Sequence, residues 1–450
     1  MRRLKSIVFV TMGCLLLVLL ARKSYAANLN AASGMTFTVN STLDEVDARP
    51  GNGVCRSKPS HVCTLRAAIM ENNALGGGNT IVLPAGKYVL TRGDPAGPYD
   101  DDATNGDLDV LVPLTLKGAG RRSTIIDAAR RDRVLDVFGK VKLMHLTIRN
   151  GATAENGGGI KVEVDGKLTL QDSVVTDNQA VNGGGIYGGG NMVLKKSKIS
   201  NNWCAHQGSG VYFNYGGSVY RSRIDHNCAD QGGGIYVTDN ADVGIPWYLE
   251  ESTVDHNKAR EGGGIYMATG GSALNSTIAS NLANLGSGNT GEGGGVYAVV
   301  YPSSRFTFIN TTIASNYAGG GSAGGIYNSN VGEVALKNTI LDYNTPDDCE
   351  GNFILLYFNL IYAPNGCTLN SDPSTQTGIH ADLWGLANNG GPTLTMALKP
   401  GSEAIDAIPV SYCLDVNNPL KTDQRGEPRP ADGDGNGKAK CDIGAYEVQP

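Results

Sequence analysis

The stretch SRIDHNCADQGGGIY (222–236) decides the fold, because both of its halves recur along the chain. The first half follows the pattern Ser/Thr-x-Ile/Val-x-x-Asn, and the second is a glycine run that ends in Ile or Val and then Tyr. The first pattern ends at Asn178, Asn202, Asn227, Asn257, Asn281 and Asn316, with looser copies at Asn150 and Asn344. From the first to the last of these positions is 194 residues in seven intervals, a mean period of about 28.

A repeat of this length indicates a solenoid built from short strands. Strands of a few residues are not stable alone, so each must pair with the copies before and after it. The glycine runs supply turns, and the Asn of each copy can stack its amide on the amide of the next copy and satisfy backbone groups that would otherwise be buried unpaired. We therefore predict an all-β, right-handed parallel β-helix of about ten coils over residues 80–370.

The composition agrees with a repetitive β protein. The chain has 450 residues with 62 Gly, but the Gly-X-Y period of collagen is absent. Lys and Arg number 37 against 43 Asp and Glu, so the net charge of −6 disfavours nucleic acid as a partner. We expect a monomer with no membrane-spanning segment once the N-terminal leader is removed.

The first 26 residues have the layout of a secretory signal peptide. Arg2, Arg3 and Lys5 precede an apolar run over 7–21, and small residues follow at 24–26. The protein is therefore expected to be exported from a bacterial cell, to the periplasm, the surface or the medium.

The cysteines support export. The chain that follows the signal peptide has eight, which suits an oxidising compartment. Sequence alone allows 105 connectivities. Sequential pairing predicts the disulfides Cys55–Cys63, Cys204–Cys228, Cys349–Cys367 and Cys413–Cys441.

Both ends of the solenoid need caps, because the terminal coils would otherwise expose the core. Residues 27–79 are the expected N-terminal cap, in which Thr64 can begin a short helix with Leu65, Ala68 and Ile69 facing the first coil. Residues 371–450 depart from the repeat and are the expected C-terminal cap.

These ends resemble a known group of bacterial surface proteins. FTVNST (37–42) and CTLRAAI (63–69) resemble the CSLREA-type N-terminal region. LANNGGPT (386–393), TDQRG (422–426) and CDIGAYE (441–447) resemble the choice-of-anchor Q region. The middle resembles pectin-lyase-like β-helices and the repeats of polymorphic outer-membrane proteins. The resemblance implies fold and location, and it leaves the activity open.

Six charged or imidazole side chains are candidate catalytic residues. Aligning the repeats places them in neighbouring rows on adjacent coils: Lys198, Arg223, Asp225, Asp255, His226 and His256. Asp225 and Asp255 are expected to point outward, about 5 Å apart. That spacing suits a retaining glycosidase or a Ca²⁺ site of a polysaccharide lyase, with Arg223 or Lys198 as base. The alternative is a pair of solvated carboxylates, whose replacement would cost little stability.

Aromatic residues are candidate glycan contacts. The Tyr that ends each glycine run forms a row: Tyr187, Tyr212, Tyr236, Tyr266, Tyr297 and Tyr327. Alternation points these rings outward, where they can stack on sugars or on one another. Trp247, in the long insert 237–250, is a further candidate.

The run DGDGNG (432–437) offers oxygen ligands at alternate positions. Asp432, Asp434 and Asn436 are therefore candidate Ca²⁺ ligands, although the Glu that completes an EF-hand loop is missing. Asp442 or Glu447 could complete an irregular site, and the alternative is a plain acidic turn.

Two functions remain open. The first is a secreted or cell-surface protein that binds an extended glycan or another cell-envelope partner without converting it. The second is a polysaccharide lyase or glycoside hydrolase that acts in a groove on the β-helix.

Overall fold

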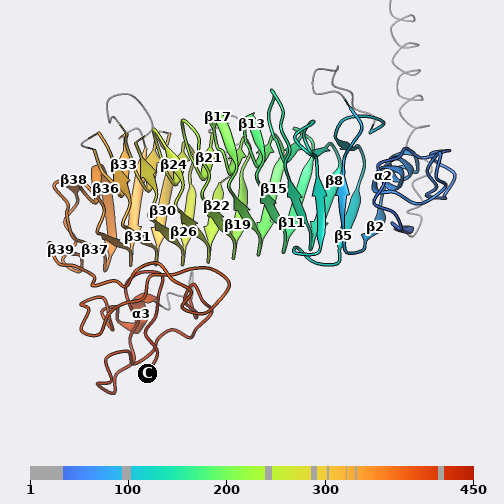
Figure 1. Cartoon of the computed structure of the whole chain (residues 1–450). Helices are drawn as coiled ribbons and strands as arrows, with labels where there is room; N and C mark the ends of the chain where they lie inside the picture. The colour runs from blue at the N-terminus through green and yellow to red at the C-terminus, as the bar shows by residue number, and fades with distance from the viewer. Residues whose placement is uncertain are drawn as a thin grey trace, which may run out of the picture.

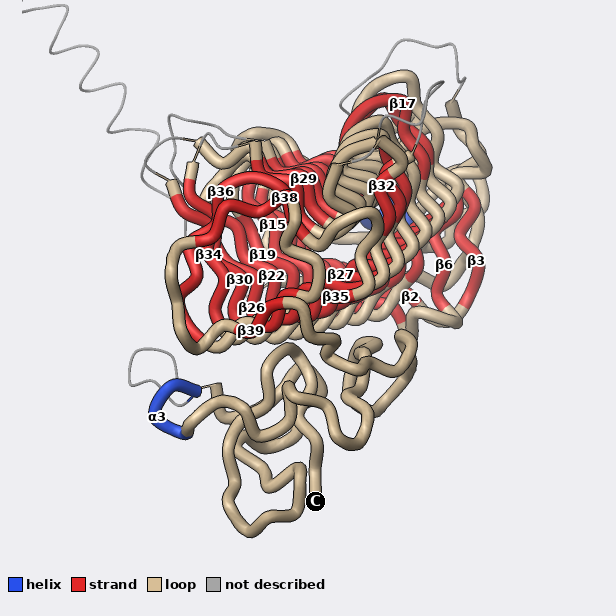
Figure 2. The backbone as a smooth tube through the Cα atoms, turned by 90° about the vertical axis from the view of Figure 1, so that its left-hand side faces the viewer, coloured by secondary structure: helices blue, strands red, loops and turns tan. Residues whose placement is uncertain are grey.

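The chain winds into a right-handed parallel β-helix (Figure 1). The computed structural model describes residues 34–93, 103–238, 246–284, 291–301, 304–320, 322–329, 332–413 and 420–450. Figure 2 looks along the solenoid and shows the stacked coils, with the C-terminal segment beneath them. The predicted signal peptide lies outside the described residues. Among those residues, no helix has the length and hydropathy that crossing a membrane requires.

Three rows of strands run along the solenoid, and two of them join into one 22-stranded sheet. The first row of that sheet is β4 (Leu108–Val110), β7 (Leu135–Val137), β10 (Ile160–Val162), β14 (Ile186–Gly188), β18 (Val211–Phe213), β21 (Ile235–Val237), β25 (Ile265–Met267), β29 (Val296–Ala298), β33 (Ile326–Asn328), β36 (Cys349–Tyr357) and β38 (Gly366–Leu369). The second is β1 (Thr36–Thr38), β2 (Asn79–Leu83), β5 (Leu114–Gly118), β8 (Lys140–Met144), β11 (Lys167–Gln171), β15 (Asn191–Lys195), β19 (Gly217–Tyr220), β22 (Trp247–Glu250), β26 (Gly271–Leu274), β30 (Arg305–Ile309) and β34 (Glu333–Lys337).

The third row is a separate twelve-stranded sheet. It consists of β3 (Gly86–Val89), β6 (Thr124–Asp127), β9 (Thr147–Arg149), β12 (Val174–Thr176), β16 (Lys198–Ser200), β20 (Arg223–Asp225), β23 (Thr253–Asp255), β27 (Thr277–Ala279), β31 (Thr312–Ala314), β35 (Ile340–Asp342), β37 (Leu360–Ile361) and β39 (Gln376–Thr377). Short extra strands pair at one corner: β13 (Gln179–Asn182) with β17 (Trp203–Gln207), and β24 (Lys258–Ala259) with β28 (Leu282–Ala283) and β32 (Tyr317–Ala318). The sequence repeats predicted about ten coils. The coils at both ends of the solenoid are harder to recognise in the sequence, because they lack the glycine run of the repeat.

The core is a set of aliphatic rows in register along the solenoid. Ile199, Ile224, Val254 and Ile278 occupy the same position in successive strands, and all are fully buried. Burying a side chain of this size contributes roughly 1.5–3 kcal/mol.

The predicted Asn ladder is confirmed. Asn202 Nδ2 donates to Asn227 Oδ1 at 3.0 Å, and Asn227 Nδ2 donates to Asn257 Oδ1 at 2.9 Å. Each ladder oxygen also accepts the backbone N–H of the preceding Asn, as from Asn202 to Asn227 at 3.0 Å. The ladder runs from Asn178 to Asn344, and its last amide donates to Asp348 Oδ1 at 2.8 Å. It therefore satisfies buried polar groups and fixes the register of the coils.

A short helix, α2 (Leu65–Ala74), covers the N-terminal end as predicted. Thr64 Oγ1 accepts the Ala67 N–H at 3.1 Å and caps the helix. Arg66 is fully buried and its Nε lies 2.6 Å from Asp44 Oδ1, which ties the helix to the preceding loop.

The C-terminal segment, which includes α3 (Val410–Cys413), lies along the side of the solenoid, whereas a cap over its end was expected (Figure 1). Thr253 Oγ1 donates to the Leu394 carbonyl at 2.6 Å, and the amide of Gln424 donates to Thr253 Oγ1 at 3.1 Å. Leu383 and Met396 join a second core with alanines of β27 and β31. The segment therefore covers one half of the outer face of the twelve-stranded sheet and leaves the other half open.

Three of the four predicted disulfides are confirmed: Cys55–Cys63, Cys349–Cys367 and Cys413–Cys441. The predicted Cys204–Cys228 bond is wrong, because both thiols are free. Cys204 is buried and lies in register with Ala180 of the preceding coil. Cys228 lies in register with Trp203, the residue before Cys204, so the two cysteines are one position apart in the repeat. Since successive side chains of a strand alternate in direction, the two sulfurs point to opposite sides of the backbone.

Candidate functional site: a cationic groove

Two carboxylates lie side by side on the outer face of the twelve-stranded sheet. Asp225 ends β20 and Asp255 ends β23, and the two residues are paired in register. Ile224 and Val254 beside them point into the core, so alternation sends both carboxylates outward. The predicted adjacency is confirmed. The prediction that these side chains are solvated is wrong, because Asp225 is 1% exposed and Asp255 is 0% exposed.

Two cations cover these carboxylates. Arg223 donates to both oxygens of Asp255, at 2.8 and 2.6 Å, and its Nη2 lies 3.2 Å from Asp225 Oδ2. Lys198 Nζ lies 3.2 Å from the same Asp225 oxygen. Burial lowers the pKa of Arg223, but the hydrogen bonds and charge of Asp255 outweigh burial and raise the pKa above its ordinary value. These contacts disfavour Arg223 as a base and the two carboxylates as a glycosidase pair, and both roles stay predictions.

Two imidazoles complete the cluster. His226 and His256 follow the aspartates at turn positions, with φ of 57° and 55°. Their Nδ1 atoms lie 3.1 Å from Asp225 Oδ2 and 2.7 Å from Asp255 Oδ2. The rings are parallel, with centroids 5.1 Å apart and 4° between their planes. All six predicted catalytic residues thus lie in one cluster, and their chemical role stays a prediction.

The cluster borders a groove of about 210 Å³ between the open half of the sheet and the C-terminal segment. Residues 388–394 form one wall, held in place where Thr393 Oγ1 donates to the Glu251 carbonyl at 3.1 Å. The other wall carries five cationic side chains: Arg121, Lys196, Lys198, Arg221 and Arg223.

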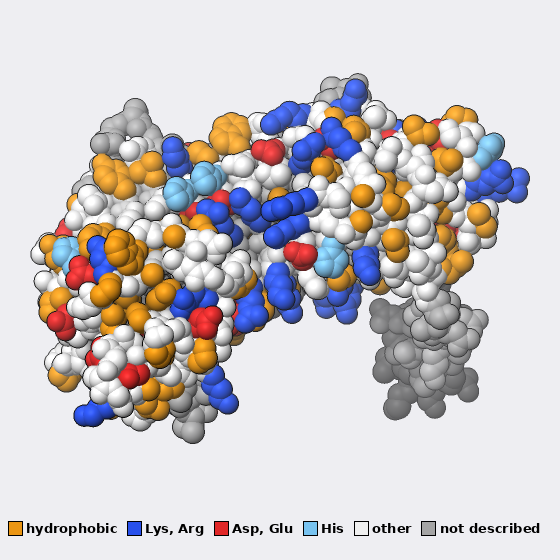
Figure 3. Space-filling model, turned by 60° about the horizontal axis from the view of Figure 1, so that its bottom comes forward, with side chains coloured by type: hydrophobic (Ala, Val, Ile, Leu, Met, Phe, Trp, Pro, Cys, Tyr) orange, Lys and Arg blue, Asp and Glu red, His pale blue; other side chains and the backbone are white. Residues whose placement is uncertain are grey.

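On this face of the sheet the cationic side chains are exposed to solvent, and most of the carboxylates that pair with them are buried. Lys87 and Lys198 are 52% and 39% exposed, while their partners Asp127 and Asp225 are 2% and 1% exposed. Asp172, beside Arg121, is an exposed exception. Figure 3 shows Lys and Arg side chains gathered in the middle of this face, next to the C-terminal segment. The protein is acidic overall, but it presents a locally cationic surface here.

The predicted tyrosine row is present, on the first row of the 22-stranded sheet. Its six rings stack face to face along the solenoid, with centroids 4.7–5.1 Å apart. The rings are half-buried or buried, and burial raises the pKa of Tyr266 and Tyr297 to about 12. Because neighbouring rings cover each other's faces, the row presents mainly edges, which suit sugar stacking poorly. The glycan contact of this row stays a prediction.

Trp247 is not a surface residue. It is fully buried, and its ring packs 6.0 Å from Phe213 and 6.0 Å from Phe306. It begins β22 at a core-facing position, in register with Gly217 and Gly271. The prediction that Trp247 contacts a ligand is therefore wrong.

The candidate Ca²⁺ site has a different composition from the predicted one. Asp432 and Asp434 approach Asp406, with one oxygen of each residue within 4.8 Å of the others. Asn436 instead donates from Nδ2 to Asp434 Oδ2 at 2.6 Å. Asp442 is buried, and its oxygens accept the backbone N–H groups of 406 and 448. Ca²⁺ stays a prediction here, with Asp406 in place of Asn436.

Glu447, the other candidate, is also engaged elsewhere. Its Oε2 lies 3.1 Å from Arg429 Nη1, and both residues are fully buried. Burial raises the pKa of Glu447, although the charge of Arg429 acts in the opposite direction.

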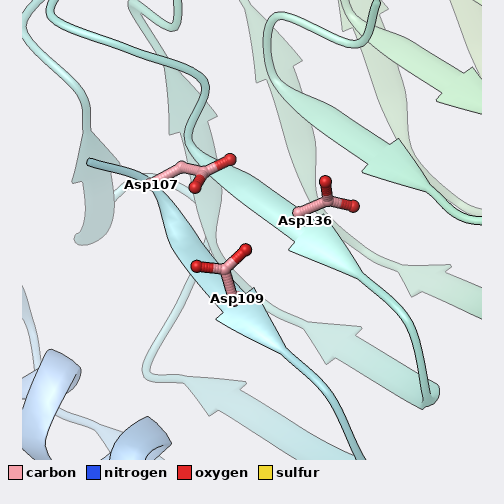
Figure 4. A group of neighbouring side chains, drawn as sticks. All are labelled: Asp107, Asp109 and Asp136. Atoms are coloured by element: carbon pink, nitrogen blue, oxygen red, sulfur yellow. The ribbon is translucent and has the colours of Figure 1, made fainter. Parts of the chain in front are cut away.

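A second carboxylate cluster was not predicted (Figure 4). Asp107, Asp109 and Asp136 are buried in the first coils, with one oxygen of each within 4.8 Å of the others. Arg133 Nη1 lies 2.8 Å from Asp107 and 3.1 Å from Asp136, so a guanidinium already bridges two of them. Lys161 Nζ lies 3.5 Å from Asp136.

The comparisons with known proteins agree with this fold. Residues 138–299 match the family model described as "Right handed beta helix region". No curated protein matches the chain significantly.

Solved structures with a similar fold include pectate lyase Pel9A, at 13% identity over 93% of this chain and 97% of that chain, with a TM-score of 0.49. The A-module of Azotobacter vinelandii mannuronan C-5 epimerase AlgE6 is 16% identical over 70% of this chain and 94% of its own, with a TM-score of 0.31. Pectin methylesterase PemA from Erwinia chrysanthemi is 11% identical over 78% of this chain and 93% of its own, with a TM-score of 0.25. These likenesses concern the fold alone.

Proposed function

We propose that this protein is a secreted or cell-surface β-helix protein that binds an extended acidic glycan, such as a polyuronate, in the cationic groove. The observation that carries the proposal is the layering of charge, with exposed cations above buried carboxylates. A ligand in the groove would meet the ammonium and guanidinium groups first. Guanidinium groups match the planar geometry of carboxylates, which favours uronates over neutral sugars.

The repeat of the solenoid supports an extended ligand. Lys198 and Arg223 are paired in register, and Lys196 and Arg221 occupy the same turn position two residues before them. Coils are separated by about 4.8 Å, which is comparable with the length of one sugar residue in an extended chain. Successive carboxylates of a polyuronate can therefore face successive cations, and the acidic net charge of the protein disfavours the denser charge of a polyphosphate.

Binding is favoured over catalysis by the state of the two aspartates. A retaining glycosidase needs one free nucleophilic carboxylate and one protonated acid. Asp255 is held by two guanidinium nitrogens of Arg223, Nε and Nη2, and Asp225 is held between Arg223 and Lys198. A lyase or hydrolase would have to break this buried ion-pair network before it could act.

Export also fits the structure. Three disulfides suit an oxidising compartment outside the cytoplasm. An extracytoplasmic location would place the groove where acidic polysaccharides occur.

The test is titration calorimetry of the full chain with polygalacturonate, alginate and a neutral dextran. We expect both acidic glycans to bind and dextran not to bind. Raising the salt from about 50 mM to about 500 mM should weaken binding at least tenfold, because exposed charges are screened. Equal binding of dextran, or tighter binding of single-stranded DNA than of the uronates, would overturn the proposal. Unsaturated uronides or new reducing ends would establish the enzymatic alternative.

A further inference from the structure

The stacked imidazoles of His226 and His256 have a property that glycan binding does not require. Each ring places its Nδ1 against a buried carboxylate, at 3.1 Å for Asp225 and 2.7 Å for Asp255. The ring planes are within 4° of parallel. The two Nε2 atoms therefore point the same way, away from the protein, on side chains that are about half exposed.

The hydrogen-bond partners determine which nitrogen of each ring is available. An ionised carboxylate only accepts hydrogen bonds, so each Nδ1 carries the proton and donates it to an aspartate oxygen. Both oxygens of Asp255 also accept hydrogen bonds from Arg223. In the neutral ring the remaining nitrogen, Nε2, then has its lone pair directed toward solvent.

We propose that His226 and His256 form a binding site for a borderline transition-metal ion, such as Zn²⁺ or Cu²⁺, which both Nε2 atoms ligate. Imidazole suits these metals, and Ca²⁺ and Mg²⁺ prefer oxygen ligands. A histidine ligand nearly always donates its second N–H to a carboxylate or carbonyl, and both residues already do so. Water would complete the coordination, because two residues supply only part of a tetrahedral shell.

The geometry requires a small movement of the rings. Corresponding atoms of two parallel rings are separated by about the centroid distance, 5.1 Å. Two Zn–N bonds of about 2.0–2.1 Å place the nitrogens roughly 3.4–4.2 Å apart, so each Nε2 must move inward by about 0.5–0.9 Å. Because each Nε2 lone pair lies in its ring plane, the two planes must also tilt toward each other so that both lone pairs point at one metal ion. The rings are anchored at Nδ1 and exposed at the other end, so they can tilt about the anchored end.

The charges directly beneath the two rings offset one another, although the groove beside them is cationic. Lys198 and Arg223 are offset by Asp225 and Asp255, so the ion-pair network beneath the rings has no net charge. The carboxylates lie directly behind the two rings and would strengthen the metal–nitrogen bonds. This site does not depend on whether the groove binds a glycan.

The chain offers a matched control. His145 also lies at a turn with positive φ, and its Nδ1 lies 2.9 Å from Asp172 Oδ2, but no second imidazole stacks on it among the described residues. Cys228 is the nearest free thiol along the chain and is itself a potential zinc ligand. His145→Gln and Cys228→Ser therefore separate the paired site from single-residue metal binding.

The experiment is titration calorimetry of the untagged full chain with ZnCl₂ at pH 7.5, in excess Ca²⁺ to occupy carboxylate clusters. We expect one saturable site. His226→Gln and His256→Gln should each weaken it at least tenfold, and His145→Gln and Cys228→Ser should change it less than twofold. Absence of saturable binding, or equal weakening by His145→Gln, would overturn the proposal.

Copper spectroscopy provides a readout that does not depend on variants. Electron paramagnetic resonance of one equivalent of Cu²⁺ on the unaltered chain should show hyperfine coupling from two imidazole nitrogens. Coupling from one nitrogen, or from none, would contradict a site shared by the two rings.

Discussion

Two clusters among the described residues bury carboxylates from adjacent coils together, and the charges of the two clusters are balanced differently. In the groove, Asp225 and Asp255 face Lys198 and Arg223, so two carboxylates meet two cations. In the first coils, Arg133 and Lys161 pair with four carboxylates, the buried Asp107 and Asp136 and the partly exposed Glu155 and Glu163.

Burial of the carboxylates in the first coils has a measurable consequence. Burial raises the pKa of Asp136 to about 6 and raises the pKa of Asp107 as well, although Arg133 acts in the opposite direction on both. The groove cluster is thus an ion-pair network beneath a cationic surface, and the N-terminal cluster contains carboxylates whose pKa values burial raises. The same coil repeat produces both clusters, and they differ in the number of cations for each carboxylate.

The largest effect is expected from removing the one guanidinium of the N-terminal cluster. Arg133→Met leaves Asp107 and Asp136 buried without their shared partner and should lower the free energy of unfolding by about 3–5 kcal/mol. Urea denaturation measures the change. The exposed neighbour Arg131, changed to Met, should cost less than about 0.5 kcal/mol. Equal losses would show that Arg133 has no special role in the cluster.

The next effect concerns pH. The pKa of Asp136 is raised in the folded state, so the native protein binds more protons than the unfolded chain at pH values between about 4 and 6. Its contribution to stability is therefore present at low pH and lost as the pH rises through that window, by at most about 3 kcal/mol. Asp136→Asn should flatten the decline in melting temperature between pH 4 and pH 7. An unchanged slope would contradict the assignment.

A smaller loss is expected in the groove. Asp255→Asn removes the negative charge and one of the two oxygens that accept hydrogen bonds from Arg223, and it should cost about 1–3 kcal/mol. The loss should be below that of Arg133→Met, because Arg223 is partly exposed and can be hydrated. The matched exposed change, Asp172→Asn, should cost less than about 1 kcal/mol. A cost below that of Asp172→Asn would restore the solvated pair that the sequence predicted.

Much of this architecture could be predicted from the repeat. The fixed Asn and the inward Ile or Val set the register, and register alone brings Asp225 beside Asp255 and Tyr236 beside Tyr266. The same register could have shown that Lys196 and Arg221 share a turn position. The register also argues against the predicted Cys204–Cys228 disulfide, because Cys204 lies two residues after Asn202 whereas Cys228 lies one residue after Asn227.

Other features have no signal in the repeat. Burial of Asp225 and Asp255 depends on the rotamers of Arg223 and Lys198, which period and alternation do not fix. The groove needs residues 388–394, which lie far away in sequence and dock through single contacts such as Thr393 to Glu251. Asp107 and Asp136 lie in coils where the glycine motif is absent, so no alignment of repeats brought them together.

The central claim is that the cationic groove binds an acidic glycan, and paired lysine variants test it most directly. Lys196→Gln/Lys198→Gln removes two charges from the groove, and Lys140→Gln/Lys167→Gln removes two exposed charges in register on β8 and β11, away from it. The measurement is the dissociation constant for the acidic glycan that binds the unaltered chain most tightly. We expect the groove pair to weaken binding at least tenfold and the other pair to change it less than twofold. Equal changes in both variants, or no change in the groove pair, would contradict the account.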